Sequence, residues 1–253
     1  MSGDAGHGAA SEATDASGEV AATLTLADWR RTIGSLYADV RRISATDPAA
    51  ALDRWRAVRE HLFREHPQSP VPADRRADFR AHHYPHDPAL RFDVRVEPLG
   101  EPEAPPAVAG AGALDFGSGA GALDFGSAGA GLAIDLPVSA GGVTSFRRFG
   151  AVRIPFPDGA RRLEVYWMEG YAGGLFLPFR DATNGTETYG AGRYLLDAAK
   201  SADLGGDLQA GTLILDFNFA FQPSCAFDPK WACPLAPPSN RLNLPIRAGE
   251  RLT

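Results

Sequence analysis

Residues 90–97 have the sequence LRFDVRVE, and this stretch marks the change from helical to strand periodicity along the chain. Apolar and charged side chains alternate through it with a period of two, which is the pattern of a strand with one buried face. Further short apolar runs, separated by glycine and proline, follow at residues 133–138, 143–149, 151–156, 163–167, 175–179 and 212–219. Many short strands without intervening helices predict an antiparallel β-sandwich or barrel-like core over residues 89–253.

The region before this stretch, residues 24–80, has helical periodicity instead. A capping-box pattern, TLAD at residues 25–28, precedes apolar residues spaced three and four positions apart. An Asp-Pro pair at 47–48 offers a cap and a first-turn proline to a second amphipathic stretch. The sequence therefore predicts an α+β fold, mostly β, in which residues 24–253 form a single domain that begins with a helical hairpin.

Two segments fall outside these patterns. Residues 1–23 are rich in Gly, Ala, Ser and acidic residues without periodicity, so we expect a disordered tail. The nine residues AGALDFGSG at 111–119 recur almost unchanged as AGALDFGSA at 120–128. Such a short unit predicts an expanded loop rather than a solenoid, whose repeats are roughly 20–50 residues long.

The composition limits the classes of partner. The chain is 44% hydrophobic and 22% charged, as in ordinary globular proteins, and its formal net charge is -6. Nucleic-acid binding needs concentrated positive charge, and no Lys/Arg run is present. No stretch approaches the roughly 20 apolar residues of a membrane span, and no signal-peptide pattern opens the chain. We therefore expect a soluble cytoplasmic protein that binds neither nucleic acid nor a membrane, with no feature that sets its oligomeric state.

The most polar stretch of the chain covers residues 180–194, which are dense in hydrogen-bonding side chains. An Asn-Gly pair at 184–185 predicts a tight hairpin turn, because both residues tolerate positive φ. Arg193 offers a planar fork that suits a carboxylate or a phosphate. The alternative is structural, with Arg193 pairing with Asp181 or Asp216 to stitch a sheet.

The leading hypothesis is a small-molecule binding or catalytic pocket between residues 180–194, residues 216–218 and the proline-rich loop 225–240. In it, Arg193 holds an anionic group, and either Asp181 or Asp216 acts as acid or base if chemistry occurs. The other candidate ligand-binding residues are Thr183, Thr186, Thr188, Tyr189, Asn218, Trp231 and Asn240. The rival interpretation is a non-enzymatic scaffold in which the same residues form a core polar network. No nucleotide, hydrolase or metalloprotease signature accompanies them, so the sequence leaves any cofactor unknown.

Cys225 and Cys233 are the only cysteines of the chain. A reducing cytoplasm favours free thiols over a permanent disulfide. Seven intervening residues are not a usual zinc spacing, so we assign no metal ligands. A facultative disulfide or a packed pair of thiols remains, and a thiol redox or metal site is a second alternative function.

Two blocks of the chain resemble one family, the domain of unknown function 1684 family. The first block covers residues 55–88 and contains His66-Pro67-Gln68-Ser69-Pro70 and Tyr84-Pro85-His86-Asp87-Pro88. The matching residues of the second block are Asp181, Thr183, Thr188-Tyr189-Gly190, Gly192-Arg193-Tyr194, Asp216-Phe217-Asn218, Pro223, Cys225, Cys233-Pro234, Pro237, Asn240 and Ala248-Gly249-Glu250. The duplicated segment and His82-His83 depart from the family pattern. The resemblance implies where a site lies but no established activity.

Overall fold

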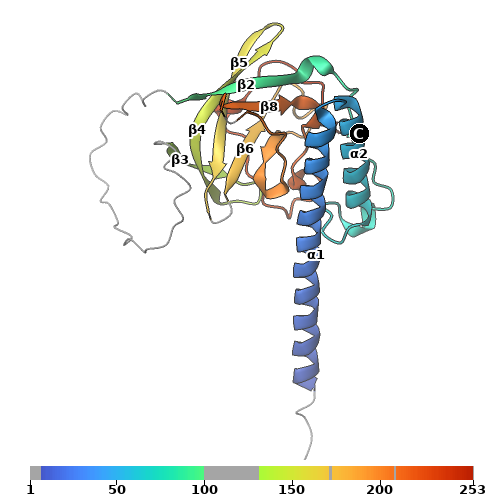
Figure 1. Cartoon of the computed structure of the whole chain (residues 1–253). Coiled ribbons are helices and arrows are strands. Elements are labelled where there is room, and N and C mark those ends of the chain that lie inside the picture. Colours follow the sequence, from blue (N-terminus) through green and yellow to red (C-terminus); the bar gives the residue numbers. More distant parts are fainter. Residues whose placement is uncertain (1–6, 100–130, 171–172, 208, 253) are drawn as a thin grey trace, which may run out of the picture.

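The chain folds as two helices followed by a curled antiparallel sheet that forms a half-barrel (Figure 1). The helices are α1 (His7–Ser44) and α2 (Pro48–Glu65). This order confirms the predicted α+β architecture with its N-terminal helical pair. The computed structural model describes residues 7–99, 131–170, 173–207 and 209–252, with side chains from residue 18 onwards.

The sheet of the described residues contains seven strands: β2 (Arg91–Pro98), β3 (Leu132–Pro137), β4 (Val143–Phe156), β5 (Gly159–Met168), β6 (Gly174–Phe179), β7 (Arg193–Asp197) and β8 (Thr212–Asp216). Their hydrogen-bonded order is β7-β6-β5-β4-β2-β8, and all pairings are antiparallel. The long strand β4 shares one edge between β3, at residues 143–148, and β2, at residues 150–152. A separate pair joins β1 (His82–His83) to β9 (Glu250–Arg251).

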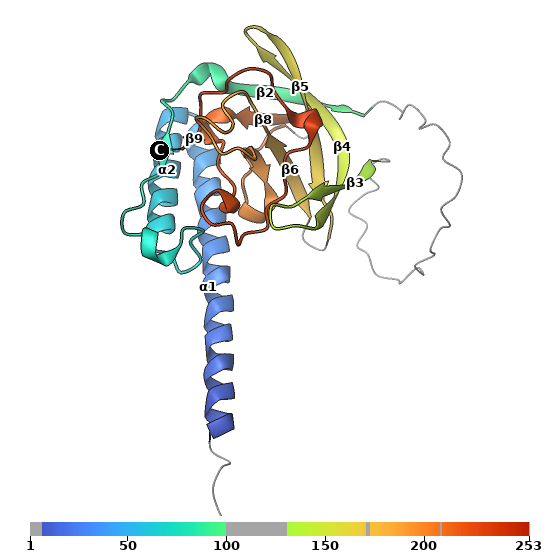
Figure 2. The ribbon, with the colours of Figure 1, turned by 180° about the vertical axis from the view of Figure 1, so that it is seen from behind.

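Both faces of the sheet are buried. One face packs against the helices, where Trp55 of α2 shares a core with Phe176. The next residue of the same strand, Leu177, points to the opposite face and packs with Phe217 and Ile246. Figure 2 shows the C-terminal part of the chain crossing the sheet on the side away from α1. The alternation of side chains along each strand thus produces two cores.

The beginning of α1 differs from the prediction. The helix begins at His7 rather than near Thr25, so most of the expected tail over residues 1–23 is helical. Thr25 donates its hydroxyl to the carbonyl of Ala22 at 2.8 Å, a bond within the helix rather than a cap. Alanine and glutamate have high helix propensity, which lets the helix continue beyond the packed part of the domain, as Figure 1 shows.

The start of α2 confirms the prediction from residues 47–48. Asp47 accepts a hydrogen bond from the backbone N–H of Ala50 at 2.9 Å, and Pro48 takes the first helical position. The helix ends at Glu65, just before His66-Pro67. Within the described ranges, neither this helix nor α1 has the length and apolar character needed to cross a bilayer.

The strands of the seven-stranded sheet agree with the predicted runs except in three places, and the short pair β1 and β9 was not predicted. Residues 143–156 form the single strand β4, although two strands were expected. The register of its pairing with β5 shifts between Arg148 and Gly150, close to the expected break. Residues 193–197 form β7, which the sequence interpretation missed because its first residues lie in the polar stretch. β8 ends at Asp216 and not at Phe219, because the chain turns there into a short 3-10 helix. The tandem nine-residue copies lie outside the described residues.

Candidate functional site

Arg193, the first residue of β7, is fully buried, with 0% of its surface exposed. Its guanidinium donates to the backbone carbonyls of Ile246 (2.7 Å), Ala248 and Glu250 (3.1 Å), and lies 3.4 Å from the carboxylate of Asp181. Burial lowers the pKa of Arg193, and the charge of Asp181 opposes that shift. The predicted pairing with Asp181 is confirmed, and this guanidinium is engaged by groups of the protein itself.

Residues 181–188 form compact turns instead of the predicted strand pair. Thr183 donates to Asp181 at 2.9 Å, and its hydroxyl lies 2.8 Å from that of Thr188. These three side chains are buried. Thr186 is exposed and donates to the carbonyl of Thr183 at 3.0 Å. The hydrogen bonds of the candidate threonines therefore stabilise the loop of residues 181–188 itself.

Asp216 and Asn218 are buried, and each makes structural contacts. Asp216 caps the 3-10 helix by accepting from the backbone N–H of Asn218 at 3.0 Å, and lies 3.3 Å from the guanidinium of Arg91. Asn218 accepts from the N–H of Asp87 at 2.9 Å and donates to its carbonyl at 2.8 Å. Because β8 ends at Asp216, the two side chains do not share the strand face that the sequence predicted.

The side-chain amide of Asn240 also makes structural contacts, because it connects the two strands β5 and β6 by hydrogen bonds. Its amide oxygen accepts from the N–H of Glu164 in β5 at 2.8 Å. Its amide nitrogen donates to the carbonyls of Glu164 (2.9 Å) and Pro178 (2.8 Å). Its side chain is fully buried, so these three bonds satisfy it inside the protein.

The two cysteines and Tyr189 lie together. The backbone N–H of Cys225 lies 3.3 Å from the sulfur of Cys233, and both thiols are free and buried. Burial and a hydrogen bond to Cys225 raise the pKa of Tyr189 to about 12. Trp231, expected beside Tyr189, points instead to the linker after α2, where its indole N–H donates to the carbonyl of Pro70 at 3.3 Å.

A groove of about 550 Å³ runs between the polar stretch and the proline-rich loop, two of the three segments of the predicted pocket. We call it the β3 groove, because β3 forms its third wall. It is lined by residues 134–137, Arg180, residues 190–191 and residues 235–238. Most of these side chains are apolar, and Asp135 bonds to Ser145 at 2.7 Å. Arg193 and Asp216 lie outside it.

Arg180 places a positive charge at the β3 groove. Its backbone is fixed on both sides, because its N–H donates to Asn240 O at 2.9 Å and its carbonyl accepts from Leu242 N at 2.7 Å. Its guanidinium donates to the carbonyl of Gly190 at 2.8 Å and is partly exposed. Within the described part of the chain, no carboxylate lies within 4.0 Å of it. Gly190 is the one hydrogen-bond partner of this guanidinium among the residues that the structure describes.

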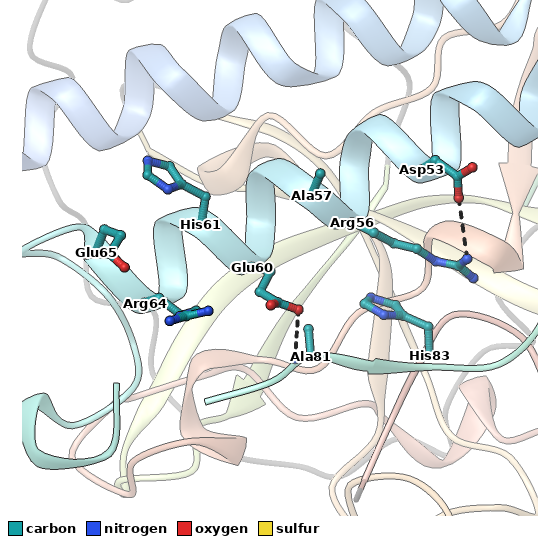
Figure 3. A pocket seen from close by; sticks show the side chains of 9 residues that line it. All are labelled: Asp53, Arg56, Ala57, Glu60, His61, Arg64, Glu65, Ala81 and His83. Carbon is teal, nitrogen blue, oxygen red and sulfur yellow. Dashed lines mark hydrogen bonds and ion pairs between the residues drawn. The ribbon is translucent and has the colours of Figure 1, made fainter. Parts of the chain in front are cut away.

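A second groove, of about 630 Å³, lies along α2 and is bordered by β1 (Figure 3). Its charged side chains partly satisfy one another. Arg56 lies 3.7 Å from Asp53 and donates to the carbonyl of Tyr84 at 2.7 Å. Glu60 accepts from the N–H of Ala81 at 3.4 Å. Two arginines and three carboxylates line the α2 groove, whereas Arg180 and Asp135 balance each other in charge at the β3 groove, so the α2 groove attracts an anion less.

Behind the α2 groove lies a buried ion pair that joins α2 to the C-terminal strand. Arg59 donates to Glu250 at 2.8 Å, and Glu250 also accepts from the backbone N–H of Gln222 at 2.8 Å. The side chains of both partners are 4% exposed. The guanidinium carbon lies 4.7 to 5.0 Å from the ring centres of Trp55, Phe63 and Phe221. These rings exclude water from the pair and add cation–π contacts.

His83 of β1 lies beside this ion pair, with Nε2 4.0 Å from Glu250. Burial lowers its pKa from 6.5 to about 4, so the ring is neutral at neutral pH. In the unfolded chain the ring protonates at higher pH than in the folded one. Between these two pKa values the unfolded state binds more protons, so stability falls as the pH falls through that window.

We expect His83→Gln to remove this part of the acid sensitivity. Relative to the variant, the unchanged protein should lose on the order of 2 kcal/mol of unfolding free energy between about pH 7 and about pH 4.5. Urea unfolding over this pH series measures the difference. The control His61→Gln changes an exposed ring on α2, and its curve should follow that of the unchanged protein. Parallel curves for His83→Gln and the unchanged protein would contradict the expectation.

Several residues important to these sites were not singled out from the sequence. Arg180 directly follows the apolar strand β6, and a cation at a strand end was the available signal. The wall formed by residues 134–137 gave no signal, because its pairing with the distant loop 235–238 depends on the fold. Arg59 and Glu250 lie 191 positions apart, and their pairing left no local pattern.

The comparisons with known proteins place the chain in one family. No curated protein matches. A solved structure is similar, the solution NMR structure of an uncharacterized protein of Haloarcula marismortui, with 28% identity and a TM-score of 0.51 over 80% of this chain and 93% of that one. The profile of "Protein of unknown function (DUF1684)" matches residues 78–251, which contain every residue of the β3 groove but only Ala81 and His83 of the α2 groove. The chain therefore belongs to the DUF1684 family.

Proposed function

We propose that the chain binds a small amphipathic carboxylate in the β3 groove, with Arg180 as the partner of the carboxylate. The observation behind this proposal is the partly exposed guanidinium of Arg180 at a groove whose other lining residues are uncharged apart from Asp135, with its backbone fixed by Asn240 and Leu242. A groove of about 550 Å³ falls in the size range of small-molecule sites, about 300–1,000 Å³.

The chemistry of the walls sets the shape of the ligand. Leu136, Leu235 and Pro237 are buried or half-buried and provide apolar surface for a hydrocarbon or ring. The guanidinium fork of Arg180 suits a carboxylate, which it contacts with two parallel hydrogen bonds. A ligand with an acid group at one end and an apolar body therefore fits better than a highly charged one.

The test uses the fluorescent probe dansyl-undecanoic acid and its methyl ester, which has the same apolar body without the charge. We expect saturable binding of the acid, and binding weaker by about tenfold or more after Arg180→Met, because a hydrogen bond to a charged group is lost. The methyl ester should bind weakly to both proteins. Fluorescence titration gives the dissociation constants, and circular dichroism checks that the variant is folded.

Two variants separate the β3 groove from other surfaces. Ala236→Trp should block it, whereas Arg64→Met, at the α2 groove, should leave binding unchanged. Equal affinity of the acid for the unchanged protein and Arg180→Met would refute the role of Arg180. Failure of the unchanged protein to bind the probe would favour the scaffold interpretation, in which the groove receives no small molecule.

A further inference from the structure

Backbone hydrogen bonds position the two cysteines next to each other. Cys225 lies in the 3-10 helix Ser224–Ala226, and the sulfur of Cys233 is 3.3 Å from its backbone nitrogen. The loop between them folds back onto the residues after β3. Ser139 accepts from Cys233 N at 3.0 Å, donates its own N–H to Cys233 O at 3.0 Å, and donates its hydroxyl to Trp231 O at 2.7 Å.

The surroundings make the two sulfurs unequal. The side chains of Cys233 and Tyr189 donate hydrogen bonds to the sulfur of Cys225, which lower the pKa of the Cys225 thiol. The same bond raises the pKa of Cys233, which keeps its proton. Ser139 does not add a third donor, because its one hydroxyl proton goes to Trp231. This inequality favours Cys225 as the thiolate that meets the oxidant and Cys233 as the thiol that closes the disulfide.

We propose that Cys225 and Cys233 are a redox-active pair that forms a reversible disulfide with hydrogen peroxide or an organic hydroperoxide as the oxidant. The thiolate of Cys225 attacks one peroxide oxygen, the O–O bond breaks, and the leaving oxygen takes a proton from the solvent to become water or an alcohol. The resulting sulfenic acid is attacked by the sulfur of Cys233, which loses its proton. The S–S bond forms, the S–O bond breaks, and a water leaves.

The proposed reaction balances in electrons and protons with these reactants. The two thiols give up two electrons and two protons, and the peroxide receives them. A thiol reductant reverses the oxidation by exchange. A metal site is less consistent with the pair, because among the described residues no group of three or more His, Cys, Asp or Glu side chains is placed to hold an ion.

Intact mass after peroxide treatment tests the proposal. The folded protein is exposed to an equimolar amount of hydrogen peroxide, unfolded in acid, and alkylated with N-ethylmaleimide. We expect a monomer without adducts whose mass is lower by two hydrogen atoms, and two adducts after prior reduction with dithiothreitol. Since the chain has only 2 cysteines, an intrachain disulfide must join this pair. Two adducts after peroxide, a disulfide-linked dimer, or added oxygen without a disulfide would overturn it.

Single variants assign the roles and do not depend on the disulfide. In Cys233→Ser, the remaining thiol should be trapped by dimedone as a sulfenic acid at least about tenfold faster than in Cys225→Ser, because the thiolate is the reactive form. Tyr189→Phe should shift the pH dependence of oxidation to higher pH and leave the final disulfide intact. Equal trapping in the two serine variants, or an unchanged pH profile in Tyr189→Phe, would contradict the assigned roles.

Discussion

Arg193→Met is expected to cost about 3–5 kcal/mol of unfolding free energy, because it leaves a buried carboxylate without its cation. The variant keeps the apolar stem of the side chain and removes every donor. Asp181 would retain Thr183 and the N–H of Ile246, at 2.6 Å, as hydrogen-bond donors, but no positive charge. The carbonyls that now accept from Arg193 would also lose a donor. Urea unfolding followed by circular dichroism measures the loss.

The control for this prediction is Arg180→Met, which removes a guanidinium from a partly exposed position 13 residues earlier. It should unfold close to the unchanged protein, since its charge remains solvated. The double variant Arg193→Met with Asp181→Asn should recover part of the stability, because the unpaired charge is gone. If Arg193→Met keeps the stability of the unchanged protein and loses only ligand binding, then the ligand-holding interpretation of Arg193 is correct after all.

Glu250→Gln should have an effect of similar size, about 3–5 kcal/mol, because it leaves Arg59 buried as an unpaired cation. The substitution preserves shape but replaces one carboxylate oxygen with a nitrogen that cannot accept a hydrogen bond. Either the N–H of Gln222 or the guanidinium of Arg59 then loses its acceptor. Thermal and urea unfolding, followed by the near-ultraviolet signal of Trp55 and its neighbours, report the loss.

Glu187→Gln is the matched control for Glu250→Gln. Glu187 pairs with Arg247 at 2.8 Å, as Glu250 pairs with Arg59, but that pair is open to solvent. Water screens exposed pairs, so this variant should remain close to the unchanged protein in stability. Equal losses in the two glutamine variants would show that burial does not set the strength of these pairs in this fold.

The sequence predicted the parts of the fold that depend on local signals. The Asp-Pro pair at 47–48 fixes the start of α2 through a cap and a fixed φ. The glycine and proline between the runs 151–156 and 163–167 mark the turn that joins β4 to β5, with φ of 117° at Gly159. β7 was missed because Arg193, a charged residue at its start, is buried by partners more than 50 positions away. Local periodicity carries no information on such partners.

The candidate site stays a prediction, and the structure shows only how its segments lie. Residues of the polar stretch and of the proline-rich loop border a common groove, which Asp216 and Asn218 do not line. The most hydrogen-bonding side chains, among them Arg193, Thr183 and Asn240, face inward and bind the backbone instead. A sequence shows how many polar groups a segment has, but their partners depend on which carbonyls the fold brings near.

The short strand β9 and the residues before it have a consequence for how the molecule opens. Residues 246–250 are bound to the sheet through Arg193, whereas the last residue of this run, Glu250, is bound to α2 through Arg59. A local opening of either the helical pair or the sheet must therefore expose one of two buried charges. We therefore expect partly unfolded states to be scarce and the two cores to melt as one cooperative unit.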